Sequence, residues 1–243
     1  MKKCCYFLVC VFLGFSCTRE QKAESFTIRG QFSNSRGEKI VLCEMDVKEV
    51  IALDSANIGK DGNVKFSHKI DQPGFYLLIF PGGRRVTLLM KKGEDLRITG
   101  NLRDPAGGFR FSGSEGSQLL GDFFHATMKN RIRIDSIKRV LRSHEGSGDF
   151  LRFSMTADSL FFRISEDQKK LEKNFIDRNP RSLASLIVLN YSFGPKPVLT
   201  MEEDLPYYRK LTSLYCIFPK NKHVLFHMAR VSLFLNNLKN PVN

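Results

Sequence analysis

The spacing of apolar residues changes near Ser114, and this change constrains the fold more than any other feature of the sequence. In FTIRGQF (26–32), apolar residues and glycine alternate with polar residues, which is the period of a β-strand. From Leu119 to Leu141 the apolar residues recur every three or four positions, which is the period of an α-helix. The sequence therefore predicts an α+β chain in which a β part precedes a helical part.

The part before Ser114 contains short runs rich in β-branched and aromatic residues. Turn signals such as Asp61-Gly62, Pro73-Gly74 and Lys92-Gly93 separate these runs. Short strands at this regular spacing are typical of an antiparallel β-sandwich or a barrel-like module. We predict such a module over residues 26–113, with strands at 26–32, 39–45, 50–58, 63–70, 75–80, 85–90, 96–100 and 109–113.

Helix start and stop signals divide the part after Ser114. Ser114 or Ser117 can cap the first helix, and the glycine-containing stretch 144–148 interrupts it. A second helix is predicted over about 155–178, with a cap near Thr156 and an end at Asn179-Pro180. Three further helices complete a predicted helical extension over residues 114–243, at 182–192, 204–217 and 221–239.

The N-terminus has the pattern of an export signal. Two lysines precede the apolar stretch CCYFLVCVFLGF (4–15), which is too short to span a membrane. Small residues then lead into Cys17, and the whole pattern resembles a bacterial lipoprotein signal of the loose type found in Bacteroidota. We predict a signal peptide over 1–16, lipid attached to Cys17 and a polar tether over 17–25. An ordinary secretory peptide and a short uncleaved anchor are the alternatives.

Processing before Cys17 would change what the mature chain carries. Two lysines and three cysteines would leave with the signal, which lowers the formal charge from +13 to +11 and leaves Cys43 and Cys216 as the free thiols. Several acyl chains anchor a protein stably to a membrane. Residues 18–21 lack the acidic run that marks surface export in this lineage. We therefore expect a lipid-anchored protein of the cell envelope, on the periplasmic face of the outer or inner membrane.

The order of elements in the β part resembles a known domain. The segments FTIRGQF, LDSANIGKDGNVKFSHKI, LLMKKGEDLRITGN and FRFSGSEGSQLL follow one another between residues 26 and 120, and Asn179-Pro180-Arg181-Ser182 comes later. Together they resemble the domain of unknown function at the N-terminus of thioredoxin-like lipoproteins of Bacteroidota, with its helical linker. This resemblance implies an envelope lipoprotein with a β module and a helical extension.

The sequence departs from those relatives in one respect. In them a thioredoxin fold with a Cys-x-x-Cys motif follows the helices, whereas this sequence ends at Asn243 and has no such motif after Cys17. We therefore expect that the thioredoxin domain is lacking and that the thiol–disulfide activity does not carry over.

Few residues are candidates for chemistry. Cys43 and Cys216 are either a disulfide or two buried thiols, and we favour the thiols. His223 and His227 share a helix face, but the acidic residue of a zinc hydrolase motif is missing between them, which favours a helix surface or a helix contact over a metal site. The sequence predicts no catalytic residue, no cofactor and no metal ion.

Two surface features point to partners or modification. Arg131, Lys138 and Arg142 stack on one face of the first helix, where they form either a solvated face or a contact with anionic lipid. Export makes nucleic acid a poor partner. Asp-Ser-apolar triplets resemble the acceptor of Bacteroidota O-glycosylation, and they contain Ser55, Ser136 and Ser159.

Two hypotheses about function remain open from the sequence. The first is a non-enzymatic binding or scaffold module that meets an envelope protein partner. The alternative is an accessory or truncated member of a thiol–disulfide oxidoreductase system. The partners of the chain in the envelope would separate the two.

Overall fold

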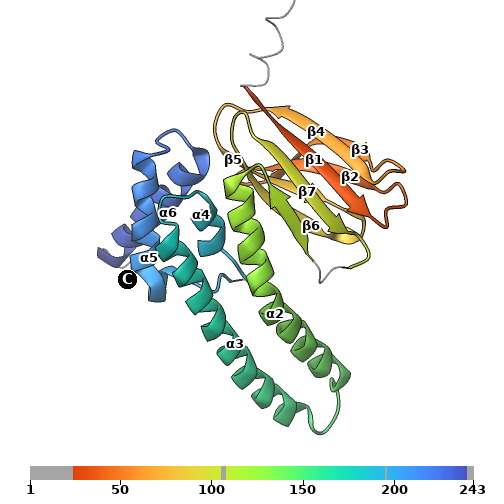
Figure 1. The fold of residues 1–243 in the computed structure, drawn as a ribbon. Coiled ribbons are helices and arrows are strands. Elements are labelled where there is room, and N and C mark those ends of the chain that lie inside the picture. Colours follow the sequence, from red (N-terminus) through yellow and green to blue (C-terminus); the bar gives the residue numbers. More distant parts are fainter. Residues whose placement is uncertain (1–23, 105–107, 195, 240–243) are drawn as a thin grey trace, which may run out of the picture.

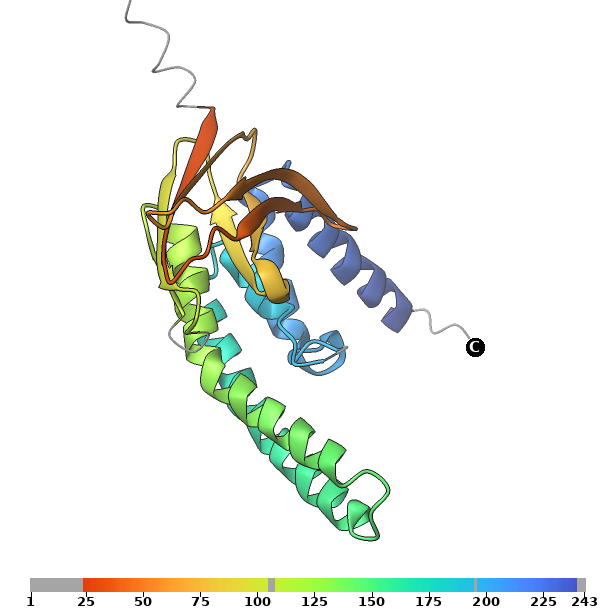
Figure 2. The ribbon, with the colours of Figure 1, turned by 90° about the vertical axis from the view of Figure 1, so that its right-hand side faces the viewer.

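The computed structural model describes residues 24–104, 108–194 and 196–239. Cys17 and the predicted signal peptide lie outside these residues. Figures 1 and 2 show a β-sandwich, a group of helices against one of its sheets, and a long helical hairpin that extends past both. None of the described helices is long and apolar enough to cross a membrane.

The described residues contain eight strands in two four-stranded sheets, which confirms the predicted α+β class and its sandwich form. Sheet A has the order β4-β1-β7-β8 and sheet B the order β3-β2-β5-β6, and the two do not close into a barrel. The strands are β1 (Ser25–Ser33), β2 (Lys39–Met45), β3 (Val50–Asn57), β4 (Asn63–Lys69), β5 (Gly74–Ile79), β6 (Arg85–Met90), β7 (Asp95–Asn101) and β8 (Phe109–Ser112).

One strand pair departs from the predicted antiparallel pattern. β1 and β7 are parallel neighbours, with Thr27 opposite Asp95 and Ser33 opposite Asn101. Parallel neighbours need a long crossover connection, and here the intervening chain forms β4 on the far side of β1 and all four strands of sheet B. Short-range turn signals cannot reveal such a pairing, because they report only on strands that are adjacent in the sequence.

The inward side chains of the two sheets form the first core. Phe26 and Ile28 of β1 are fully buried, and so is Leu42 of β2. The ring of Phe26 meets that of Tyr76 edge to face at 4.7 Å between centroids. The period-two pattern of the sequence thus places one apolar face of each sheet in the sandwich.

Sheet B is covered on its other face by helices. Every residue of β5 from Gly74 to Leu78 is buried, since Tyr76 and Leu78 face the sandwich whereas Phe75 joins the second core. That second core also contains Leu89 of β6 and the apolar faces of the helices. The molecule therefore has three layers, and the helices share a core with sheet B.

The helices follow the predicted order. They are α2 (Glu115–Ser143), α3 (Phe150–Arg178), α4 (Ala184–Leu189), α5 (Met201–Thr212) and α6 (Lys222–Lys239), and the short 3-10 turn η2 (Ser213–Cys216) follows α5. Ser114 is the N-cap of α2, as predicted, because its hydroxyl accepts from the Ser117 amide. The hydroxyls of Ser114 and Ser117 also lie 2.9 Å from the Leu89 carbonyl oxygen, so the start of α2 covers the edge of β6.

Two predicted helix starts were wrong. α3 begins at Phe150 rather than near Thr156, whose hydroxyl donates to the Arg152 carbonyl within the helix. The ring of His144, after α2, contacts the ring of Phe153, in the first turn of α3, with 3.7 Å between their centroids. This contact fits a short connection between the two helices. α5 begins at Met201, because Thr200 caps it by accepting from the Glu203 amide.

Candidate functional site

The outer face of sheet A carries cations on three neighbouring strands. Lys65 of β4 lies opposite Arg29 of β1, and Arg29 lies opposite Arg97 of β7. All three are exposed. Adjacent strands lie about 4.8 Å apart, and like charges placed directly opposite each other destabilise a sheet. This row therefore favours an anion above it.

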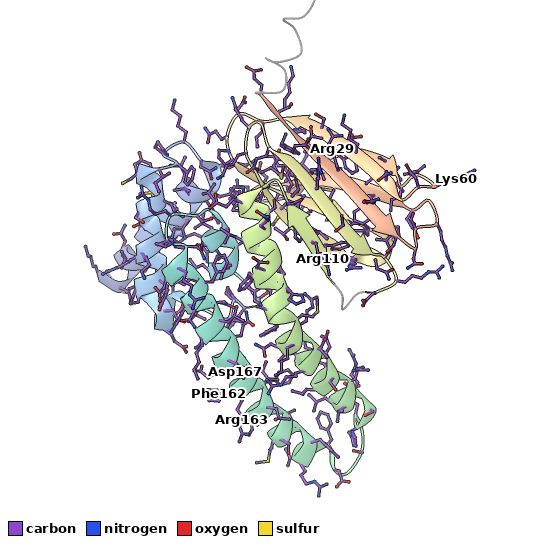
Figure 3. All side chains as sticks on the ribbon, viewed as in Figure 1. Arg29, Lys60, Arg110, Phe162, Arg163 and Asp167 are labelled. Atoms are coloured by element: carbon purple, nitrogen blue, oxygen red, sulfur yellow. The ribbon has the colours of Figure 1, made fainter. Side chains whose placement is uncertain are left out.

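The next row of the same face adds a fourth cation. Arg110 of β8 lies opposite Thr99 of β7, and Thr99 lies opposite Gln31 of β1. We call Lys65, Arg29, Arg97 and Arg110 the cationic face. Figure 3 shows Arg29 and Arg110 on the exposed side of sheet A.

Few acidic groups neutralise the cationic face. Arg29 pairs with Asp95, with 2.9 Å between Nε and Oδ1. Lys65, Arg97 and Arg110 form no ion pair with a carboxylate of the described residues. A hollow of about 420 Å³ opens beside Arg110 and is lined by the polar side chains of Gln31, Ser33 and Thr99 and by one acid, Asp61.

A second surface lies on the hairpin of α2 and α3. In the first half of α3, Leu151, Met155 and Phe162 are 73%, 65% and 68% exposed. Their spacing places them on one side of the helix, and Figure 3 shows Phe162 on the side of α3 away from α2. We call these three residues the apolar stripe.

The apolar stripe continues an interface inside the molecule. In the second half of α3, Lys169 and Lys173 lie on the same side of the helix as the stripe. They pair with Glu203 and Asp204 of α5, each with 2.6 Å between Nζ and a carboxylate oxygen. The same side of α3 thus forms ion pairs with α5 in its second half and is exposed in its first half.

A buried polar network lies between α2 and α3. Asn130 donates to Gln168 over 3.2 Å, and Gln168 donates to Oε1 of Glu172 over 3.0 Å. Glu172 is fully buried, and its Oε2 has no hydrogen-bond partner among the described residues. Burial, with a smaller contribution from the charge of Asp204, raises the pKa of Glu172 to about 8, so the carboxyl is mostly protonated at neutral pH.

A strongly shifted carboxyl is a candidate for proton transfer only where a substrate can reach it. Glu172 lines neither the hollow beside Arg110 nor a second hollow of about 320 Å³ between the sandwich and the helices. That second hollow is lined by the Asn179-Pro180-Arg181-Ser182 element, together with Lys91 and Glu115. We therefore assign Glu172 to the helix core rather than to an active site.

The two thiols of the described residues are free. Cys43 is buried in β2, as expected, and burial raises its pKa. Cys216 is exposed, which corrects the expectation that both are buried. The reason is that η2 turns Leu214 into the core and leaves Tyr215 and Cys216 outside.

The histidine pair joins helices and strands. His227 is buried, and its Nε2 donates to the Tyr208 carbonyl oxygen of α5 over 2.8 Å. The His223 ring packs edge to face on Phe75 of β5, 4.8 Å between centroids. Burial lowers the pKa of both imidazoles. These contacts agree with the helix-contact interpretation, and the described residues contain no cluster that could hold a metal ion.

The other predicted surface residues are all accessible. Arg131, Lys138 and Arg142 are exposed along α2, and Lys138 donates to the Phe193 carbonyl oxygen over 3.1 Å. Ser55, Ser136 and Ser159 are exposed as well, so their modification stays a prediction. Sequence reasoning missed the cationic face and the apolar stripe.

Comparison with known proteins finds one family model that matches the β part. Residues 26–120 match the model of a family described as "Domain of unknown function (DUF4369)". The match covers all eight strands and the first turn of α2, where Ser114 and Ser117 bond to β6. The matched domain therefore ends where the first helix is fixed to the sandwich. It contains the whole cationic face, whereas the apolar stripe lies outside it.

The other comparisons add little. No curated protein matches the chain. Among solved structures, a 9R-lipoxygenase from Cyanothece PCC8801 is similar over 74% of this chain and 33% of its own, with 12% identity and a TM-score of 0.22. The chain thus covers a third of that protein, and a likeness at this TM-score supports no argument about fold or function.

Proposed function

We propose that the chain is a lipid-anchored protein of the bacterial cell envelope that acts as a non-enzymatic scaffold. In this proposal Cys17 carries the lipid, the matched domain lies next to the membrane, and the hairpin of α2 and α3 presents the apolar stripe to an envelope protein. The observation that carries the proposal is the exposed stripe on the same side of α3 that binds α5.

The chemistry of the partner follows from that internal interface. α5 presents acidic residues to the lysines of α3, as described above. Beside the stripe, Arg152 and Arg163 are exposed cations on α3. Asp158 is an exposed acid on the side of the stripe, so the surface carries charges of both signs, and the fitting partner is a helix with an apolar face. Three exposed apolar side chains that become buried together supply the apolar centre of such an interface.

Replacing the stripe should abolish partner binding without unfolding the protein. Leu151→Ser, Met155→Ser and Phe162→Ser remove apolar surface that is already exposed, so we expect each to change stability by at most about 0.5 kcal/mol. Loss of three apolar contacts should weaken binding by at least about a hundredfold. The matched control is Leu225→Ser, Phe226→Ser and Leu233→Ser, three exposed apolar residues of α6.

A photo-crosslinking amino acid at Met155, in cells, identifies the partner. The captured envelope protein is then purified, and its dissociation constant is measured against the parent chain, the stripe variant and the α6 control. Equal affinity for the parent chain and the stripe variant would contradict the proposal, and so would capture of a second copy of this chain. A captured thioredoxin-like protein would favour the alternative, an accessory role in a thiol–disulfide system.

A further inference from the structure

We infer that the cationic face of sheet A binds the anionic headgroups of the membrane to which the chain is anchored. The chemistry comes from the face itself. Arginine forms paired hydrogen bonds with phosphate, and lysine binds it as a point charge. Lys65, Arg29 and Arg97 form one row across three strands, and Arg110 extends the face onto a fourth.

The surface fits a flat array of anions better than a single small one. The outward side chains of sheet A are polar or charged on all four strands, and they include Thr27, Gln31, Ser67, Thr99 and Ser112. The opposed cations spread across the face rather than converging on one atom, since each lies on a separate strand. A layer of phosphate-bearing headgroups offers the matching spread of negative charge.

The position of the face in the chain points to the membrane as the occupant, and this step rests on the proposed anchor at Cys17. Seven residues, 18–24, lie between Cys17 and the first residue of β1, Ser25, so an extended chain places Ser25 at most about 28 Å from the anchor. Arg29 lies four residues into β1, about 13 Å from its start. The cationic face is therefore within reach of the bilayer that holds the lipid.

The cations of α2 are placed differently. Arg131, Lys138 and Arg142 lie in the second half of a helix of 29 residues, at least about 24 Å along its axis from Glu115. Figures 1 and 2 both show the turn between α2 and α3 at the end of the molecule opposite the start of β1. The three cations of α2 can therefore be compared with the three cations of the sheet row, Lys65, Arg29 and Arg97.

Vesicle flotation tests the inference without the lipid. The mature chain from residue 17, with Cys17→Ser, is mixed with vesicles of phosphatidylcholine alone or with phosphatidylglycerol added. We expect flotation only with the anionic vesicles and a loss of binding as salt rises. Lys65→Gln, Arg29→Gln and Arg97→Gln together should weaken partition about a hundredfold, or about fivefold per cation. The control Arg131→Gln, Lys138→Gln and Arg142→Gln should keep most of the binding.

Several results would overturn the inference. These are equal flotation with both vesicles, loss of binding in the α2 variant but not in the sheet variant, and tighter binding of dextran sulfate than of vesicles. Circular dichroism melts of both variants show whether they are folded. Failure of the scaffold proposal would appear elsewhere, in the affinity of the partner captured at Met155, so the two failures are distinguishable.

Discussion

Replacing Phe75 by alanine is expected to lower the free energy of unfolding by about 4 kcal/mol. Phe75 is 1% exposed and belongs to the core that sheet B shares with the helices. Its ring contacts that of His223 at the start of α6. Truncation leaves a cavity between the sandwich and the helices, and neither layer can close it alone.

The same substitution tests whether the sandwich and the helices unfold together. We expect a single transition in which the helical and β signals of circular dichroism shift to lower denaturant concentration by the same amount. Phe162→Ala is the matched control, because this phenylalanine is 68% exposed and its loss should cost less than about 0.5 kcal/mol. A shift in the helical signal alone would show that the helices form a separate unit.

Glu172→Gln is expected to stabilise the protein at neutral and alkaline pH. The folded-state pKa of Glu172 is raised from 4.5 to about 8, chiefly by burial. Between pH 4.5 and about pH 8, Glu172 has released its proton in the unfolded chain and still holds it in the folded chain. The contribution of Glu172 is therefore fully present below about pH 4.5 and is lost as the pH rises toward 8.

The size of the effect follows from the shift in pKa. The parent chain should lose about 3 kcal/mol of stability between about pH 5 and pH 8 through this one group. Glutamine stays neutral and keeps the oxygen that accepts from Gln168, so the variant should be about 2 kcal/mol or more above the parent at pH 8. Urea unfolding at several pH values measures both curves. Asp158→Asn, an exposed acid of the same helix, should leave the slope unchanged, and a parent slope equal to that of Glu172→Gln would contradict the assignment.

Local signals in the sequence predicted the elements well. Ser114 marks the change from strands to helices because its hydroxyl caps α2, and Asn179-Pro180 ends α3 because the residue before proline avoids helical backbone. The run FYLLIF (75–80) does not alternate between apolar and polar residues, because β5 is buried on both faces. This lack of alternation indicates a second layer over sheet B.

The candidate surfaces depend on long-range pairing, which local signals do not report. The alternation in β1, β4 and β7 shows that Arg29, Lys65 and Arg97 point outward, but only the parallel register of β1 and β7 makes them neighbours. The apolar stripe has a similar cause. Met155 and Phe162 fall within the helix predicted over about 155–178, whereas Leu151 precedes it. All three are exposed because α5 contacts only the other half of α3.

The place of this protein at the membrane depends on the proposed anchor, so the mass of the chain isolated from the cell envelope is the most direct test. We predict a polypeptide that begins at Cys17 and carries the added mass of a diacylglyceryl group with its acyl chains on that residue. A Cys17→Ala variant should lack this mass and should retain the first sixteen residues. A parent chain that begins at Met1, or one with an unmodified Cys17, would contradict the lipid anchor and with it the place of this protein at the membrane.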